Sequence, residues 1–77
     1  MTSQRKHERD IERDVPPRQF AAKLRRLADC IENGKPFRIQ VAGERVSIPL
    51  SATISIEHER LGDEEELEFQ LRWPRGR

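Results

Sequence analysis

Four glutamates near the C-terminal end are the residues of this 77-residue chain whose type and spacing most suggest chemistry. They are Glu57, Glu59, Glu66 and Glu68. Carboxylates in such a group can attract a basic protein surface or a divalent cation, pair with a cation of a neighbouring strand, or keep one sheet from stacking on another. We expect solvation or pairing within the fold first, and contact with a protein partner second.

A second charged group lies on a helix predicted over residues 17–33. Its cations are Arg18, Lys23, Arg25 and Arg26. With two arginines of the C-terminal tail they are the set best suited to contact phosphates. A single-strand binder also needs aromatic side chains that stack on bases, and the three Phe and one Trp are all predicted inside. Nucleic-acid binding is therefore the alternative function, ranked second.

The sequence shows no site for metal binding, hydrolytic catalysis or cysteine chemistry. His7 and His58 have no third ligand at metal-site spacing, and the serines lack a base with an orienting acid. Cys30 has no second cysteine, so it suits neither a disulfide nor a zinc knuckle. We predict no catalytic residue, no metal, no cofactor and no enzymatic activity. His58 is expected to pack half-exposed at the end of a strand.

The charges are nearly balanced but unevenly distributed. Fifteen basic and fourteen acidic residues give a net charge of +1. Residues 1–26 carry eight Lys or Arg and four Asp or Glu, whereas residues 57–68 carry seven acids and one base. Such asymmetry can orient a partner or be satisfied within one fold. With no apolar stretch of membrane-spanning length and no leader-like start, we expect a cytoplasmic protein without membrane contact.

The elements follow from periodicity. Residues 65–73 alternate apolar and polar through four cycles, which predicts a strand with one dry face. Prolines at 16 and 17 and Gly34 delimit the helix. Its apolar residues have helical spacing and are expected to face the sheet. They are Phe20, Leu24, Leu27, Ala28 and Ile31.

Two hairpins follow the helix. The first, over residues 37–50, is predicted to turn at Gly43 and Glu44. This register sets Val41 opposite Val46, Ile39 opposite Ile48 and Phe37 opposite Leu50.

The second hairpin is predicted to turn at Gly62 and Asp63. Its dry face would then pair His58 with Leu67, Ile56 with Phe69, Ile54 with Leu71 and Ala52 with Trp73. Its wet face would oppose Glu57 to Glu68 and Glu59 to Glu66, which are unfavourable like-charge pairs.

Together these elements predict an α+β domain in which one helix packs on a single, mainly antiparallel sheet of four to five strands, in the order β-α-β-β-β-β. Residues 8–14 are either the first, charged edge strand or part of a disordered segment. Residues 1–7 are expected to form a disordered charged tail, residues 8–73 one domain, and residues 74–77 a basic tail. About sixteen apolar side chains would meet in the core.

Three segments in this order, Leu27–Gly34, Phe37–Pro49 and Leu67–Trp73, resemble the amphi-Trp domain family over residues 9–73. The resemblance implies a small bacterial or archaeal domain and no assigned reaction, ligand or partner. Two features depart from the family pattern: Pro16 stands where a hydroxyl residue would cap the helix, and the first strand is unusually charged.

The sequence thus favours a non-enzymatic protein-interaction module. Its partner would be an unidentified protein or a second copy of the chain. This prediction depends on the like-charged cross-strand pairs and on the absence of a recognisable set of catalytic residues in the sequence.

Overall fold

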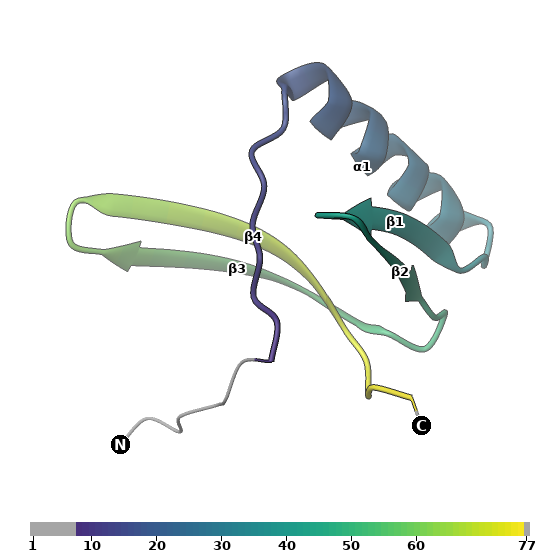
Figure 1. Ribbon diagram of the computed structural model, residues 1–77. Coiled ribbons are helices and arrows are strands. Elements are labelled where there is room, and N and C mark those ends of the chain that lie inside the picture. The colour runs from purple at the N-terminus through teal and green to yellow at the C-terminus, as the bar shows by residue number, and fades with distance from the viewer. Residues whose placement is uncertain (1–7, 77) are drawn as a thin grey trace.

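One helix and four strands make up residues 8–76, the part of the chain that the computed structural model describes. They follow in the order α1 (Pro17–Glu32), β1 (Phe37–Val41), β2 (Glu44–Ile48), β3 (Thr53–Leu61) and β4 (Glu64–Arg72) (Figure 1). The α+β class is therefore confirmed. The tail predicted over residues 1–7 lies outside the described residues.

Helix α1 begins and ends where the prolines and Gly34 predict. Pro16 is the N-cap in an extended conformation, and its carbonyl accepts the N–H of Phe20 at 3.0 Å. Proline provides no side-chain cap. At the other end Gly34 has a φ of 63°, and the N–H of Lys35 reaches back to the carbonyl of Cys30 at 2.8 Å. This is a Schellman motif, which satisfies carbonyls of the last turn.

The helix packs on β1 through the flank of its apolar stripe. The guanidinium of Arg26 lies 5.0 Å from the ring centroid of Phe37 and donates to the carbonyl of Arg38 at 2.6 Å. Leu27 is half-buried, whereas Phe20 and Leu24 of the same stripe are exposed. Phe20, Leu24 and Leu27 line a cavity that faces Phe37 of β1, so this part of the stripe faces β1 as predicted, but the sheet does not bury it.

The first hairpin has a different register from the predicted one. Phe37 pairs with Ile48, Ile39 with Val46 and Val41 with Glu44, so the turn is Ala42-Gly43. Both turn residues have positive φ, 48° and 83°, as in the type I′ turn that fits the twist of two-residue hairpins. A two-residue shift keeps Phe37 and Ile39 opposite apolar residues and leaves only Val41 opposite a charged one, so side-chain alternation could not separate the two registers.

The second hairpin has the predicted register throughout its ladder. His58 pairs with Leu67, Ile56 with Phe69 and Ile54 with Leu71, and the two glutamate pairs lie directly opposite each other. The turn is Gly62-Asp63, with Gly62 at a φ of 61°. The ladder ends at Thr53 and Arg72, so the predicted pairing of Ala52 with Trp73 lies just beyond the strands.

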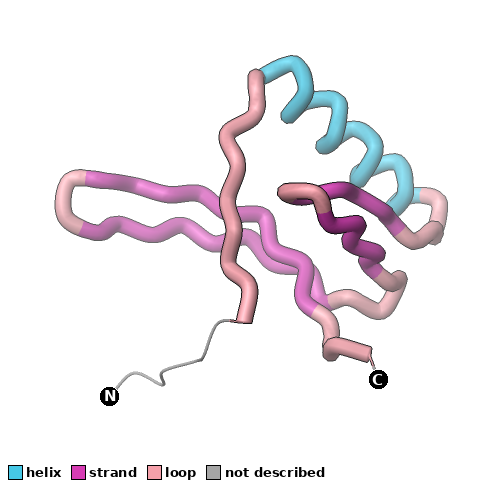
Figure 2. The backbone as a smooth tube through the Cα atoms, viewed as in Figure 1, coloured by secondary structure: helices cyan, strands magenta, loops and turns pink. Residues whose placement is uncertain are grey.

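The strands form two separate two-stranded sheets, β1-β2 and β3-β4, and not the single sheet that was predicted. The hairpins differ in length, since β1 and β2 have five residues each and β3 and β4 nine. The longer hairpin extends well away from α1 and from the shorter one (Figure 2). One helix of 16 residues cannot cover both hairpins.

Residues 8–14 form no strand, so of the two alternatives for this segment the edge strand is wrong. Side chains hold this segment instead. Arg9 donates to the carbonyl of Val41 at 2.6 Å and lies 3.4 Å from the carboxylate of Glu44, and Glu8 pairs with Arg75 at 2.6 Å. The segment is therefore held by long charged side chains and not by backbone hydrogen bonds to a neighbouring strand.

The buried core is small. Among the described residues two apolar side chains are buried, Phe37 with 5% and Ile48 with 7% of its surface exposed. Both come from the first hairpin, at the β1-β2 end beneath α1. The prediction of about sixteen core side chains is wrong, because the second hairpin and the helix stripe do not close on each other.

Candidate functional site

One side of the β3-β4 hairpin, here called the hairpin face, is a mainly apolar and mainly exposed surface. It consists of Ile54, Ile56, His58, Leu67, Phe69 and Leu71. All nine residues of β3 are exposed. Ile56, Leu67 and Phe69 have 65%, 64% and 62% of their surfaces exposed. Monomeric proteins rarely expose a large contiguous apolar surface, so this one is the candidate site.

The hairpin face continues onto the exposed part of the helix stripe. Phe20 and Leu24 of α1 line a space of about 460 Å³ together with Leu67 and Phe69 of β4. A smaller space of about 70 Å³ lies among Ile31 of the helix and apolar residues of both hairpins. The helix and β4 thus form the walls of a mainly apolar groove, the space of about 460 Å³, that their own side chains do not fill.

The opposite side of the hairpin bears the carboxylate row, which is Glu57, Glu59, Glu66 and Glu68. The side-chain amide of Gln70 donates to Glu57 at 2.9 Å and to Glu68 at 2.8 Å. Within residues 8–76 the row has no ion-pair partner. The nearby charge of Glu68 is the main cause that raises the pKa of Glu66 above its ordinary 4.5, with desolvation and Glu59 adding to it.

A polar cluster lies on the hairpin-face side near the tip of the hairpin. The Nε2 of His58 lies 2.8 Å from the carboxylate of Glu65, and the Nε of Arg60 lies 3.4 Å from the same carboxylate. All three side chains are exposed. Their position beside Leu67 gives the apolar surface a charged, solvated rim, as protein interfaces have.

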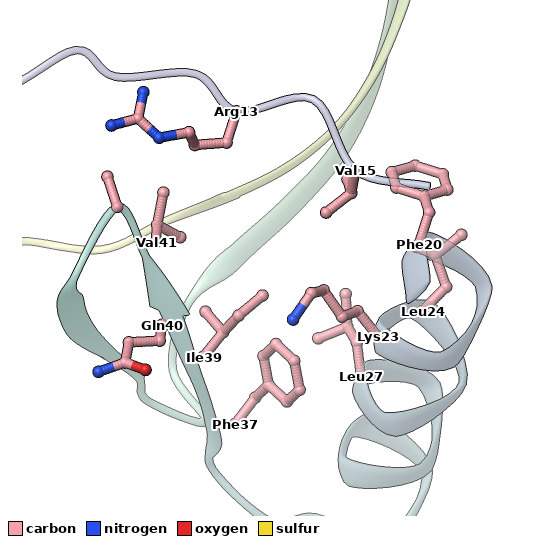
Figure 3. A pocket seen from close by; sticks show the side chains of 11 residues that line it. Arg13, Val15, Phe20, Lys23, Leu24, Leu27, Phe37, Ile39, Gln40 and Val41 are labelled. Carbon is pink, nitrogen blue, oxygen red and sulfur yellow. The ribbon is translucent and has the colours of Figure 1, made fainter. Parts of the chain in front are cut away.

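A separate cavity of about 270 Å³ lies between α1, β1 and the segment before the helix (Figure 3). Its walls are mainly apolar. Figure 3 shows Lys23 reaching from α1 toward Ile39 of β1, and Arg13 above the opening. The cavity adjoins the small core, and the polar side chains that line it are Arg13, Lys23 and Gln40.

The four helix cations do not form one surface. Arg26 is engaged with Phe37 and Arg38, and Lys23 lines the cavity, whereas Arg18 and Arg25 are exposed. A phosphate-binding patch would therefore retain two free cations on the helix. This leaves the nucleic-acid alternative with fewer residues than the sequence predicts.

Residues 8–76 contain no cluster of three or more His, Cys, Asp or Glu arranged to hold a metal ion. Cys30 is a free, half-buried thiol. No helix in this part of the chain is long and apolar enough to cross a membrane.

The comparison with known families covers almost every residue. The sequence matches the Amphi-Trp domain over residues 2–77. The chain belongs to the Amphi-Trp domain family. No curated protein and no solved structure matches it. The terminal tryptophan of this Amphi-Trp domain, Trp73, is half-buried just after β4.

Sequence reasoning missed the exposure of the hairpin face, although it identified the residues. It placed Ile56, Leu67 and Phe69 in a core that this Amphi-Trp domain does not form within one chain. The signal that could have found them is strand length. Nine-residue strands span about 30 Å, and a helix of 16 residues about 24 Å, so one helix leaves much of a long hairpin uncovered.

Proposed function

We propose that this Amphi-Trp domain is a non-enzymatic protein-interaction module that binds another polypeptide through its hairpin face. The observation that carries the proposal is the exposure of Ile56, Leu67 and Phe69 in one contiguous patch. Full burial of such a side chain is favourable by about 1.5–3 kcal/mol, so binding of a partner that covers this surface is strongly favoured.

The groove beside α1 supports the same function. It is lined by Phe20, Leu24 and Leu27 of α1, by Leu67 and Phe69 of β4, and by the polar residues Glu68 and Gln70. An extended strand or hairpin of a partner fits such a groove, because the edges of β3 and β4 are unpaired and can accept a further strand.

The carboxylate row has a different role in this proposal. It lies on the opposite side of the hairpin from the apolar contact, where like charges keep a second sheet from stacking. It also makes the hairpin negative and so favours approach by a partner with basic residues. The sequence-based prediction of partner binding by these four glutamates stays a prediction.

The experiment that tests the proposal is site-specific photo-crosslinking in cells or lysate of the source organism. A photoreactive phenylalanine analogue replaces Phe69 on the hairpin face or, as the matched control, its neighbour Gln70 on the other face. We expect protein adducts from position 69 and few from position 70. Equal yields from both positions, or none from position 69, would overturn the proposal.

Nucleic-acid binding is distinguished in the same preparation. Nuclease treatment before irradiation should leave the adducts at position 69 unchanged. Binding through Arg18 and Arg25 would instead fall steeply as salt rises, because phosphate contacts release counterions.

A further inference from the structure

The stability of a single chain requires something to cover the hairpin face at all times. Small domains bury a modest share of their surface and become marginal when the core is thin. Here two apolar side chains are buried among residues 8–76, and both belong to the short hairpin. A two-stranded hairpin alone is at best marginally stable in water. The nine-residue strands therefore depend on a cover that is present whenever the chain is present.

We propose that this cover is a second copy of the same chain, so that two Amphi-Trp domains dimerise through their β3-β4 hairpins. The inference rests on the proposed function, because it names the partner of the same surface. A second copy is the one polypeptide whose supply always matches that of the first.

The area of the exposed apolar surface is close to what a stable dimer needs. Seven large apolar side chains on the hairpin face and the helix stripe are exposed: Phe20, Leu24, Ile31, Ile54, Ile56, Leu67 and Phe69. At roughly 60–120 Å² for each buried side chain, they supply about 400 to 800 Å² per chain. A stable interface of standard size buries about 800 Å² per partner, and the polar rim adds to the apolar part.

The charges of the chain do not oppose contact with a second copy. Arg18 and Arg25 on the helix have no ion-pair partner within residues 8–76, and neither does the carboxylate row. The whole chain has a net charge of +1, so two copies carry almost no overall repulsion. The carboxylate row lies on the opposite side of the hairpin, so two hairpin faces can meet without burying these charges.

The geometry permits a closed, two-fold arrangement. Two equal hairpin faces can stack as two sheets about 10 Å apart, with their side chains interdigitated. The space of about 460 Å³ between α1 and β4 would receive apolar side chains of the other hairpin. Because the same patch serves both copies, the contact is isologous and stops at two chains.

Sedimentation equilibrium of the purified protein, from micromolar to millimolar concentration, tests the proposal directly. We expect the mass of two chains for the native sequence. Ile56→Glu, which buries a charge in the contact, should shift the population to one chain or to unfolded monomer. Ser55→Glu is the matched control, because it adds the same charge at the neighbouring position on the opposite face, and it should stay dimeric.

Cysteine crosslinking keeps the test valid even if Ile56→Glu does not fold. Cys30 is first replaced by Ser, and Phe69→Cys or Gln70→Cys is then introduced. Mild oxidation should link two chains through position 69, on the shared face, and not through position 70. A single-chain mass at all concentrations, or equal crosslinking at both positions, would overturn the dimer.

Failure of the dimer and failure of the proposed function give different results. A protein that sediments as one chain but forms photo-adducts with another protein from position 69 would retain the interaction function and lose the self-association. A protein that sediments as one chain and forms no adduct from position 69 would lose both.

Discussion

At the scale of single residues, two neighbouring arginines on α1 have different roles. Arg26 stacks on Phe37 and donates to the carbonyl of Arg38, whereas Arg25 has no hydrogen-bond, ion-pair or ring partner within residues 8–76. The sequence does not separate these adjacent arginines, because both lie off the apolar stripe. The difference arises from where β1 crosses the helix.

Removal of the Arg26 side chain should therefore destabilise the fold. We expect Arg26→Ala to lower the free energy of unfolding by about 1–2 kcal/mol, through loss of a cation–π contact and a charged hydrogen bond at an exposed site. Arg25→Ala should change it by less than about 0.5 kcal/mol. Urea denaturation of both variants gives the comparison, and equal losses would contradict the assigned role of Arg26.

The carboxylate row makes the stability of the fold depend on pH through Glu66. Its folded-state pKa lies above the ordinary 4.5, mainly because of the charge of Glu68. The folded state therefore holds the proton more tightly than the unfolded state. Stability from this group is fully present below pH 4.5 and is lost as pH rises through the raised folded pKa.

Glu66→Gln should abolish that loss. We expect the variant to be slightly more stable than the native protein at neutral pH, because no charge forms beside Glu68. Its urea midpoint should also change less with pH through the weakly acidic range. Glu64→Gln removes a carboxylate from the same strand outside the two glutamate pairs and should keep the native slope. A steeper slope in Glu66→Gln would refute the sign of the effect.

At the scale of elements, sequence predicted the hairpins well and their assembly poorly. Alternation and turn residues located α1 and all four strands, and the like-charged pairs of the second hairpin are where the pattern put them. The first hairpin was misregistered by two residues, since a shift of two preserves alternation and only the φ values of Ala42 and Gly43 decide the turn.

That turn offers a prediction of its own. Ala42 has a φ of 48°, a region that costs residues with a Cβ about 1 kcal/mol or more and that Asn tolerates better. Ala42→Asn should raise the free energy of unfolding by about 0.5–1 kcal/mol. Gly43→Ala, at a φ of 83°, should lower it by about 1 kcal/mol. Thermal unfolding of both variants checks the opposite signs.

The candidate site was the part least accessible to sequence reasoning. Residues of the hairpin face alternate with polar residues as the residues of a core do. This alternation is the same whether the apolar side is buried by the same chain or by another. Whether the second hairpin pairs with the first depends on the Ile48–Thr53 connection and on strand length, which alternation does not report.

At the scale of the whole molecule, the small buried core and the exposed hairpin face have one explanation in a dimer that buries the hairpin face. If two copies share that face, stability depends on protein concentration, because unfolding separates the chains. We expect the apparent free energy of unfolding to rise by about 1.4 kcal/mol for each tenfold increase in concentration. Denaturation at several concentrations measures this slope, and a midpoint independent of concentration would contradict a dimer.

The two-residue turns also determine the order of folding events. The most distant residues paired in either ladder are Thr53 and Arg72, 19 positions apart, so no pairing requires a long loop to close. Hairpins of this kind form in about 1–10 μs, and chains with such low contact order fold quickly. Each hairpin would then form and open many times before two molecules meet by diffusion, and the encounter would stabilise the long hairpin. Refolding should accordingly show a fast first-order phase, followed by a second-order phase in which the fluorescence of Trp73 reports the encounter.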